Sequence, residues 1–275
     1  MTEPTTTAGQ IPPILLVGCG RMGSAMLAGW REQGLAPSIA VDPSPAAAAF
    51  AGPDLSVVAQ ASEIPADFAP AAVVVAVKPQ NAAETLPDYA RFAGGPVFLS
   101  IMAGRTIAGI AKPLGAKAAI VRAMPNTPAA IRQGVTVACP AEGVSIPQRS
   151  LCDRLLHAIG SVAWVEDEAF MDPVTAVSGS GPAYVFLLAE LMEEAALEHG
   201  LPPDLARLLA RQTVAGSGAL LAASHEETSA LRRAVTSPGG TTAAALAVMM
   251  ASDALPLIVP QAIEAAARRS RELAG

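Results

Sequence analysis

The chain has 275 residues, of which 52% are hydrophobic and 15% charged, and its formal net charge is −6. This composition is typical of a globular protein with enough apolar material for one large or two modest domains, and it excludes an intrinsically disordered chain. The acidic balance and the lack of a basic stripe argue against a nucleic-acid partner.

The three cysteines, Cys19, Cys139 and Cys152, have no metal-ligand spacing. Their odd number favours a reducing compartment, so we expect a cytoplasmic protein without a metal site. Residues 1–12 lack the basic and apolar regions of a signal peptide and are expected to form a disordered tail. The longest apolar window, 241–267, is interrupted by two acids and two prolines, which favours a buried helix pair over a membrane span.

An apolar run at 14–17 leads into a glycine-rich turn at 18–23 and then into a segment with helical spacing at 24–30. Glycines at the first, third and sixth positions of such a turn are typical of a dinucleotide site. They permit a tight turn, a close approach of the backbone to the pyrophosphate, and packing of the helix on its strand. The helix N-terminus then offers N–H groups to the phosphates. Alone, the turn predicts only dinucleotide binding, because glycine turns also occur for structural reasons.

A second strand is predicted at 38–42, and it ends in Asp42, 24 residues after Gly18. A carboxylate at this spacing is suited to bind the hydroxyls of the adenosine ribose, which favours NAD and repels a 2′-phosphate. The alternative interpretation is that Asp42 caps a helix before Pro43.

Further strands are predicted at 56–58, 71–77, 96–101, 119–122, 134–138 and 162–165, with a helix at 151–159. This alternation from residue 13 to 166 predicts a doubly wound, mostly parallel sheet. The loops around Lys78, Ala103 and Asn126 follow strand ends and are expected to face the same crevice as the glycine turn. Lys78 is interpreted either as a cofactor contact or as an ordinary solvated lysine.

Residues 167–275 change character, with helices predicted at 184–199, 204–224, 228–235, 242–251 and 260–274. These helices are apolar around much of their circumference, and a bundle of this size cannot bury so much apolar surface alone. We therefore expect an all-α domain that forms an obligate dimer.

The loop Ser237–Thr242 joins two glycines and several hydroxyls at the start of a predicted helix. Such a loop is suited to hold an anion, although a plain helix N-cap has the same composition. Beside a cofactor domain, a second anion site is what a small carboxylate substrate needs.

Taken together, the motifs resemble the pyrroline-5-carboxylate reductase family over essentially the whole chain after the tail. The peptides that carry this resemblance are Gly18-Cys-Gly-Arg-Met-Gly23, Ala76-Val-Lys-Pro-Gln80, Ser100-Ile-Met-Ala-Gly104, Arg122-Ala-Met-Pro-Asn-Thr-Pro128, Ser178-Gly-Ser-Gly-Pro-Ala-Tyr184 and Val235-Thr-Ser-Pro-Gly-Gly-Thr-Thr242.

The resemblance implies an N-terminal Rossmann domain, a helical domain that interlocks in a homodimer, and often a decamer. It implies hydride transfer from NADPH or NADH to the C=N carbon of 1-pyrroline-5-carboxylate, giving L-proline in the last step of proline synthesis. The implied cofactor-binding residues are Gly18, Cys19, Gly20, Arg21, Met22, Gly23, Lys78, Pro79, Ala103, Gly104 and Asn126. Asp42 is added to this set for its spacing after the glycine turn, and Val77 for its place at the end of a predicted parallel strand. The implied catalytic residues are Thr242 and Ser237, and the implied substrate-binding residues are Gly239, Gly240, Thr241 and Ser178.

Two departures from the family pattern concern the adenosine end of the cofactor. Many members carry a serine, or an Asn-Arg pair, after the second strand to accept a 2′-phosphate, whereas this chain has Asp42-Pro43-Ser44. The loop near Ala61-Ser62 also lacks the asparagine that some members place near the ribose. Both departures weaken the family's usual preference for NADPH and leave the choice of cofactor open.

The residue inventory agrees with imine reduction. A protonated imine is already electrophilic, so the enzyme needs no metal and no strong acid, and Thr242 is suited to accept a hydrogen bond from the iminium N–H. The alternatives are another imine reductase of the same architecture, a hydroxyacid dehydrogenase of the 6-phosphogluconate type, and a cofactor-binding regulatory protein. The dehydrogenase commonly uses a lysine in its helical domain, but the only lysines here are Lys78, Lys112 and Lys117. A regulatory protein would not need the Ser237–Thr242 loop.

Overall fold

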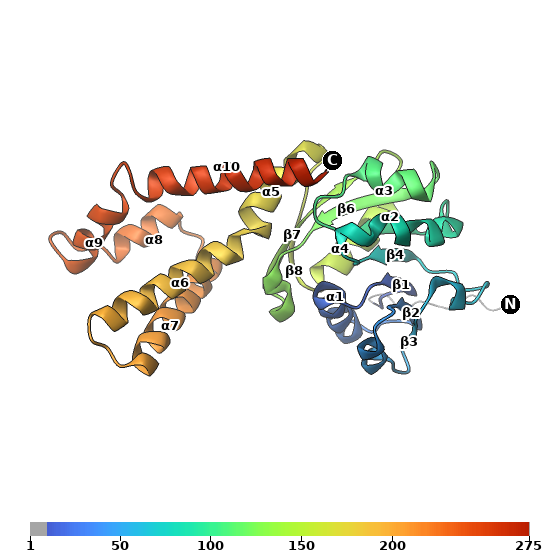
Figure 1. The fold of residues 1–275 in the computed structure, drawn as a ribbon, viewed down its shortest axis with the longest axis horizontal. Coiled ribbons are helices and arrows are strands. Elements are labelled where there is room, and N and C mark those ends of the chain that lie inside the picture. Colours follow the sequence, from blue (N-terminus) through green and yellow to red (C-terminus); the bar gives the residue numbers. More distant parts are fainter. Residues whose placement is uncertain (1–9, 275) are drawn as a thin grey trace. The chain divides into compact units, whose positions relative to one another are not determined.

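The computed structural model describes residues 10–274 and divides the chain into two compact units (Figure 1). Unit 1 comprises residues 1–179 and 267–275, and unit 2 comprises residues 180–266. Of the predicted tail 1–12, residues 1–9 lie outside the described part of the chain. Ile11 is fully buried, donates its N–H to the Gly34 carbonyl and accepts the N–H of Ala36. The ordered domain therefore begins upstream of residue 13.

Within the described residues, unit 1 contains an eight-stranded sheet with the order β3-β2-β1-β4-β5-β6-β7-β8. The strands are β1 (Ile14–Val17), β2 (Ser38–Val41), β3 (Leu55–Val58), β4 (Ala72–Val75), β5 (Val97–Ser100), β6 (Ala119–Met124), β7 (Gly134–Pro140) and β8 (Gly160–Trp164). All neighbours pair in parallel except β6 and β7. Only the short turn η5 (Thr127–Ile131) joins these two strands, and a parallel connection needs about a dozen residues or more.

Helices cover both faces of this sheet. The helical elements include α1 (Arg21–Glu32), η1 (Pro45–Phe50), α2 (Ala82–Thr85), η4 (Leu86–Phe92), α3 (Ile107–Leu114) and α4 (Ile146–His157). Alternate residues of β1 point to opposite faces, so Ile14 and Leu16 join the core under α1 and α4, while Leu15 and Val17 join the core under η4 and α3. The predicted doubly wound sheet is confirmed, and its strand ends define the edge where ligands bind in such folds.

A run of short helical elements ends the first part of unit 1. These are η6 (Glu168–Phe170), α5 (Met171–Val174) and the π-helix η7 (Thr175–Gly179). Glu168 holds these helical elements to the sheet. Its Oε1 accepts one hydrogen bond from Nη1 of the buried Arg122 at 2.8 Å and another from the N–H of Ile107 at 2.7 Å. One carboxylate thereby joins β6, the N-terminus of α3 and the segment that leads out of the sheet.

Unit 2 is all helical over its described residues. Its helices are α6 (Gly181–Glu198), α7 (Pro203–Ala223), α8 (Thr228–Ala234), α9 (Thr241–Met249) and α10 (Leu255–Ala274), the last of which ends in unit 1. Helices α6 and α7 lie side by side (Figure 1). The last helix starts at Leu255 and not at the predicted residue 260, because Pro256 occupies its first turn and the helix continues through Pro260.

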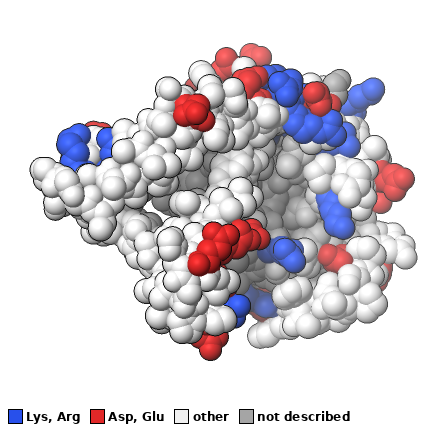
Figure 2. Space-filling view, turned by 60° about the vertical axis from the view of Figure 1, so that its left-hand side comes forward, with Lys and Arg blue, Asp and Glu red and all other residues white. Residues whose placement is uncertain are grey.

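The helices of unit 2 expose large apolar side chains. The most exposed include Phe186 (64%), Leu208 (55%), Leu220 (59%), Val248 (73%) and Ile258 (53%). Figure 2, which turns the left side of Figure 1 forward, shows a mostly uncharged surface with scattered charges. One helical stretch, 168–198, is long and apolar enough to cross a membrane by length and composition, with 6% of its most apolar window buried. Large apolar side chains that are exposed together commonly mark a surface that binds a partner.

Candidate active site

The glycine turn has the geometry that a dinucleotide site requires. Gly18 has φ +96°, in the left-handed region, and a Cβ there would meet the Ala76 carbonyl oxygen at 2.9 Å. Gly20 is the N-cap of α1, and a Cβ there would meet no described atom within 4 Å. A Cβ on Gly23 would collide with the Gly18 carbonyl. The turn therefore leaves one backbone face open at the N-terminus of α1, where pyrophosphate binds in such folds.

A cavity of about 500 Å³ adjoins this turn at the carboxyl ends of β1, β2 and β4. Of the predicted cofactor residues, Gly18, Gly20, Asp42, Val77 and Lys78 line it. The lining also includes residues without an assigned role in the sequence, namely Gln60, Asn81, Glu84, Thr85, Asp88 and Tyr89. Most of these lie on η3 (Pro79–Asn81), α2 and η4, directly after β4. The sequence feature that could have identified them is their position directly after a strand whose end faces the crevice.

Asp42 is held by two backbone N–H groups. Its Oδ2 accepts the N–H of Cys19 at 2.6 Å, inside the glycine turn, and its Oδ1 accepts the N–H of Ser44 at 2.9 Å. Asp42 therefore holds the backbone that follows β2 and also lines the cavity. Each carboxylate oxygen keeps a further lone pair for a ligand hydroxyl.

The charges around the cavity are mainly negative. Asp42, Glu84 and Asp88 line it, and Lys78 is the basic residue among the described lining residues. This negative charge repels a phosphate on the adenosine ribose, whereas the uncharged hydroxyls of an unmodified ribose are not repelled.

Cys19 lies inside the glycine turn but is not suited to nucleophilic chemistry. Burial, and secondarily the Asp42 carboxylate, raise the pKa of the Cys19 thiol to about 11. A thiol with so high a pKa stays protonated at neutral pH, and the thiolate is the reactive form. Cys139 and Cys152 are also free and buried, and burial raises the pKa of the Cys152 thiol to about 12.

Other predicted cofactor residues do not line this cavity. Arg21, Met22 and Gly23 form the first turn of α1, and Pro79 begins η3. Ala103 and Gly104 form the loop after β5, where Gly104 has φ +67° and packs against Leu273 near the end of α10.

Asn126 is engaged within the protein at both ends of its side-chain amide. Its Oδ1 accepts the N–H of Val135 at 2.9 Å, and its Nδ2 donates to the carbonyl of Ser178 at 3.1 Å. The Ser178 hydroxyl donates to the Val174 carbonyl at 2.9 Å inside the π-helix. In unit 1 these two predicted site residues thus join the end of β6 to η7.

The predicted substrate loop lies in unit 2 and forms a type II turn. The N–H of Gly240 donates to the Ser237 carbonyl at 3.1 Å, with Pro238 and Gly239 (φ +70°) in the central positions. Gly240 is the N-cap of α9, and no side chain in the described part of the chain caps that helix. The first N–H groups of any α-helix have no intrahelical acceptor, and in α9 no described side chain takes that place; the half-buried Thr242 lies in this first turn.

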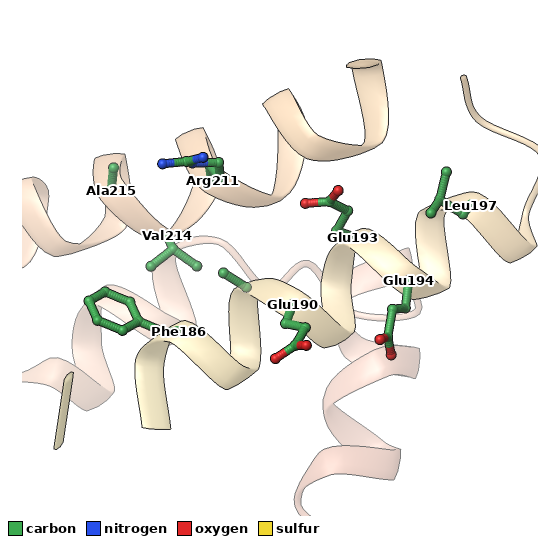
Figure 3. A pocket seen from close by; sticks show the side chains of 9 residues that line it. Phe186, Glu190, Glu193, Glu194, Leu197, Arg211, Val214 and Ala215 are labelled. Atoms are coloured by element: carbon green, nitrogen blue, oxygen red, sulfur yellow. The ribbon is translucent and has the colours of Figure 1, made fainter. Parts of the chain in front are cut away.

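A second cavity, of about 650 Å³, lies between α6 and α7. Phe186, Leu197 and Val214 supply apolar lining, and Arg211 and three glutamates supply charge. Figure 3 shows the carboxylate of Glu193 on the α7 side of α6 and those of Glu190 and Glu194 on the other side. Its open, apolar character fits the exposed helical surface of unit 2 rather than a reaction centre.

Comparisons with known proteins cover both units. The family model for pyrroline-5-carboxylate reductase dimerisation matches residues 168–273, and that for a coenzyme F420-dependent NADP oxidoreductase matches residues 13–104. A pyrroline-5-carboxylate reductase from Pseudomonas aeruginosa is 38% identical over 96% of this chain and 97% of its own length. The chain belongs to the pyrroline-5-carboxylate reductase family. The predicted family and enzyme class, an NAD(P)H-dependent oxidoreductase acting on a C=N bond, are confirmed with it.

Solved structures of the family have the same fold. The reductase from Coxiella burnetii has a TM-score of 0.89 at 32% identity and covers 97% of this chain and 100% of its own. The Plasmodium falciparum enzyme, solved with NADP bound, has a TM-score of 0.82 at 27% identity and covers 97% and 100%. Aquifex aeolicus prephenate dehydrogenase, at 14% identity, shares the fold alone, with a TM-score of 0.53.

Proposed function

We propose that this protein reduces 1-pyrroline-5-carboxylate to L-proline with a nicotinamide dinucleotide as hydride donor. The observation that carries the proposal is the uncapped N-terminus of α9 behind the turn Ser237–Gly240, in a chain whose other unit holds a dinucleotide cavity. Open backbone N–H groups and hydroxyls bind a carboxylate without any metal. Among residues 10–274, no three His, Cys, Asp or Glu side chains are placed to hold a metal ion.

The chemistry asked of the protein is mainly binding and orientation. When bound, the nicotinamide supplies a hydride to the imine carbon. Ser237 and the N–H groups of Thr241 and Thr242 hold the substrate carboxylate, which orients the ring. The Thr242 hydroxyl accepts a hydrogen bond from the iminium N–H, and the product nitrogen keeps that proton as the amine forms.

This function is tested by steady-state assays of 1-pyrroline-5-carboxylate reduction that compare the parent protein with variants of Thr242. Thr242→Val keeps the shape of the side chain and removes the hydroxyl, and we expect kcat/KM for the imine to fall about tenfold or more. Thr242→Ser keeps the hydroxyl and should stay within a fewfold of the parent. Equal kinetics of the two variants would remove Thr242 from the site, and no turnover by the parent protein would refute the function itself.

NADH is proposed as the preferred cofactor. Asp42 is held in place by Cys19 and Ser44, and its free lone pairs suit the 2′- and 3′-hydroxyls of the adenosine ribose. Glu84 and Asp88 add negative charge to the same cavity. The Plasmodium falciparum relative was solved with NADP bound, and assays of this protein with NADH and NADPH side by side measure its preference directly.

The family's dimerisation domain supports an oligomer, and we propose a homodimer formed through unit 2, with assembly into a decamer as its extension. The exposed apolar side chains of α6, α7, α9 and α10 are the surface that association would remove from water. We expect light scattering at micromolar concentration to give at least twice the chain mass of 27.8 kDa. A stable monomer under those conditions would refute the proposal.

The remaining proposals concern partners and location. The free, buried cysteines are compatible with a reducing compartment, and a cytoplasmic enzyme is proposed. Its partners are then the cyclic imine, L-proline and further copies of itself, without nucleic acid, membrane or metal.

A further inference from the structure

Arg105 connects the two loops that follow β4 and β5. It comes directly after the Gly104 turn, and its half-buried guanidinium reaches back to the first residue of η3. Nε and Nη2 donate to the carbonyl oxygen of Pro79 at 2.9 and 2.7 Å. Two donors from one rigid fork specify the position of the carbonyl more tightly than one bond.

The segment held by this contact has little backbone support of its own. Pro79 has no N–H to donate. Within 78–82 the backbone bonds run from the N–H of Asn81 to Lys78 and from the N–H of Ala82 to Pro79. Both bonds stay inside the turn, so they shape it without tying it to the sheet. Arg105 supplies a link from this turn to a different strand end.

The residues on either side of the held carbonyl line the dinucleotide cavity. Val77 and Lys78 precede Pro79, and Asn81 follows it. Among residues 10–274, no carboxylate forms an ion pair with Arg105. The guanidinium is therefore committed to a neutral carbonyl, where its geometry matters more than its charge.

We propose that Arg105 is a positioning residue for the cofactor, which holds the Lys78–Asn81 turn in the conformation that binds the dinucleotide. Arg105 does not line the cavity, so it acts through Pro79 and not by contact with the cofactor. The proposal rests on the proposed function only in requiring that NADH binds.

The test compares three variants of the full-length protein. Arg105→Met keeps an apolar stem and removes both hydrogen bonds, so we expect the dissociation constant for NADH to rise about tenfold. Arg105→Lys keeps a hydrogen-bond donor, so its dissociation constant for NADH should rise only about threefold. Arg91→Met is the matched control, because Arg91 also donates to a backbone carbonyl, that of Ile64 at 3.2 Å, but none of residues 62–66 lines the dinucleotide cavity. We expect it to bind NADH like the parent.

NADH binding is measured by titration without imine, so failure to reduce 1-pyrroline-5-carboxylate would count against the function and not against Arg105. In turnover assays we expect the KM for the cofactor to rise, while kcat and the KM for the imine change less than about twofold. Unchanged NADH affinity in Arg105→Met would overturn the proposal. A loss of affinity in Arg91→Met as large as that in Arg105→Met would overturn it too. If Arg105→Met does not fold, Arg105→Lys decides by the same criteria.

Discussion

Replacing Glu168 with alanine is expected to lower the free energy of unfolding of unit 1 by about 3 kcal/mol, at the lower end of the cost of breaking a buried ion pair. The partner left behind, Arg122, has a side chain that is 5% exposed, so its charge would lose a carboxylate at 2.8 Å without gaining water. The N–H of Ile107 would lose its acceptor as well. Because Glu168 itself is 30% exposed, the upper end of the range is not expected.

Thermal unfolding at fixed protein concentration measures this loss, and a domain of this size should melt about 6–12 °C lower. The neighbouring pair of Glu166 and Arg149 has the same 2.8 Å separation but side chains 72% and 38% exposed. Glu166→Ala should therefore cost about 1 kcal/mol at most. The double variant Arg122→Met with Glu168→Ala should be more stable than Glu168→Ala alone, because the orphaned charge is gone. If Glu168→Ala melts like Glu166→Ala, the pair does not hold η6 to the sheet.

Local patterns in the sequence predicted most of the fold. The buried strand at 72–75 was visible as a continuous apolar run, because both faces of a parallel strand are covered. The glycine spacing predicted the turn before α1, where Gly18 has a left-handed φ and Gly23 has no room for a Cβ. The apolar residues around much of α6 and α7 predicted helices whose apolar surface is not fully buried within one chain.

Contacts between distant side chains and backbone carbonyls could not be predicted in this way. Arg105 and Pro79 are 26 residues apart, and Asn126 and Ser178 are 52 apart. Neither pair shows a period or a motif that indicates contact. The family resemblance placed Asn126 near the cofactor, but its amide is engaged with Val135 and Ser178. Sequence reasoning thus predicted candidate site residues, but it did not predict the contacts that hold them in the structure.

Asp42→Ser is expected to lower the ratio of kcat/KM with NADH to kcat/KM with NADPH by about a hundredfold, or two factors of ten at about 1.4 kcal/mol each. One factor comes from NADH, because ribose hydroxyls lose hydrogen bonds to a charged acceptor. The other comes from NADPH, because a fixed carboxylate no longer repels its 2′-phosphate. The serine also leaves the N–H of Cys19 without the acceptor it has at 2.6 Å, so both cofactors should bind somewhat less tightly.

Two further variants separate charge from geometry. Asp42→Asn keeps one oxygen to accept a backbone N–H but loses the charge, so it should relieve the repulsion of NADPH while retaining more of the turn than serine does. Asp88→Asn removes a charge from another part of the same cavity lining. Asp88 is exposed and its field is screened, so the ratio should change only a fewfold. An unchanged ratio in Asp42→Ser would mean that Asp42 serves only the backbone of Cys19 and Ser44. An equal change in Asp88→Asn would assign the preference to the overall charge of the cavity, since specific recognition of the ribose requires the effect to be concentrated at Asp42.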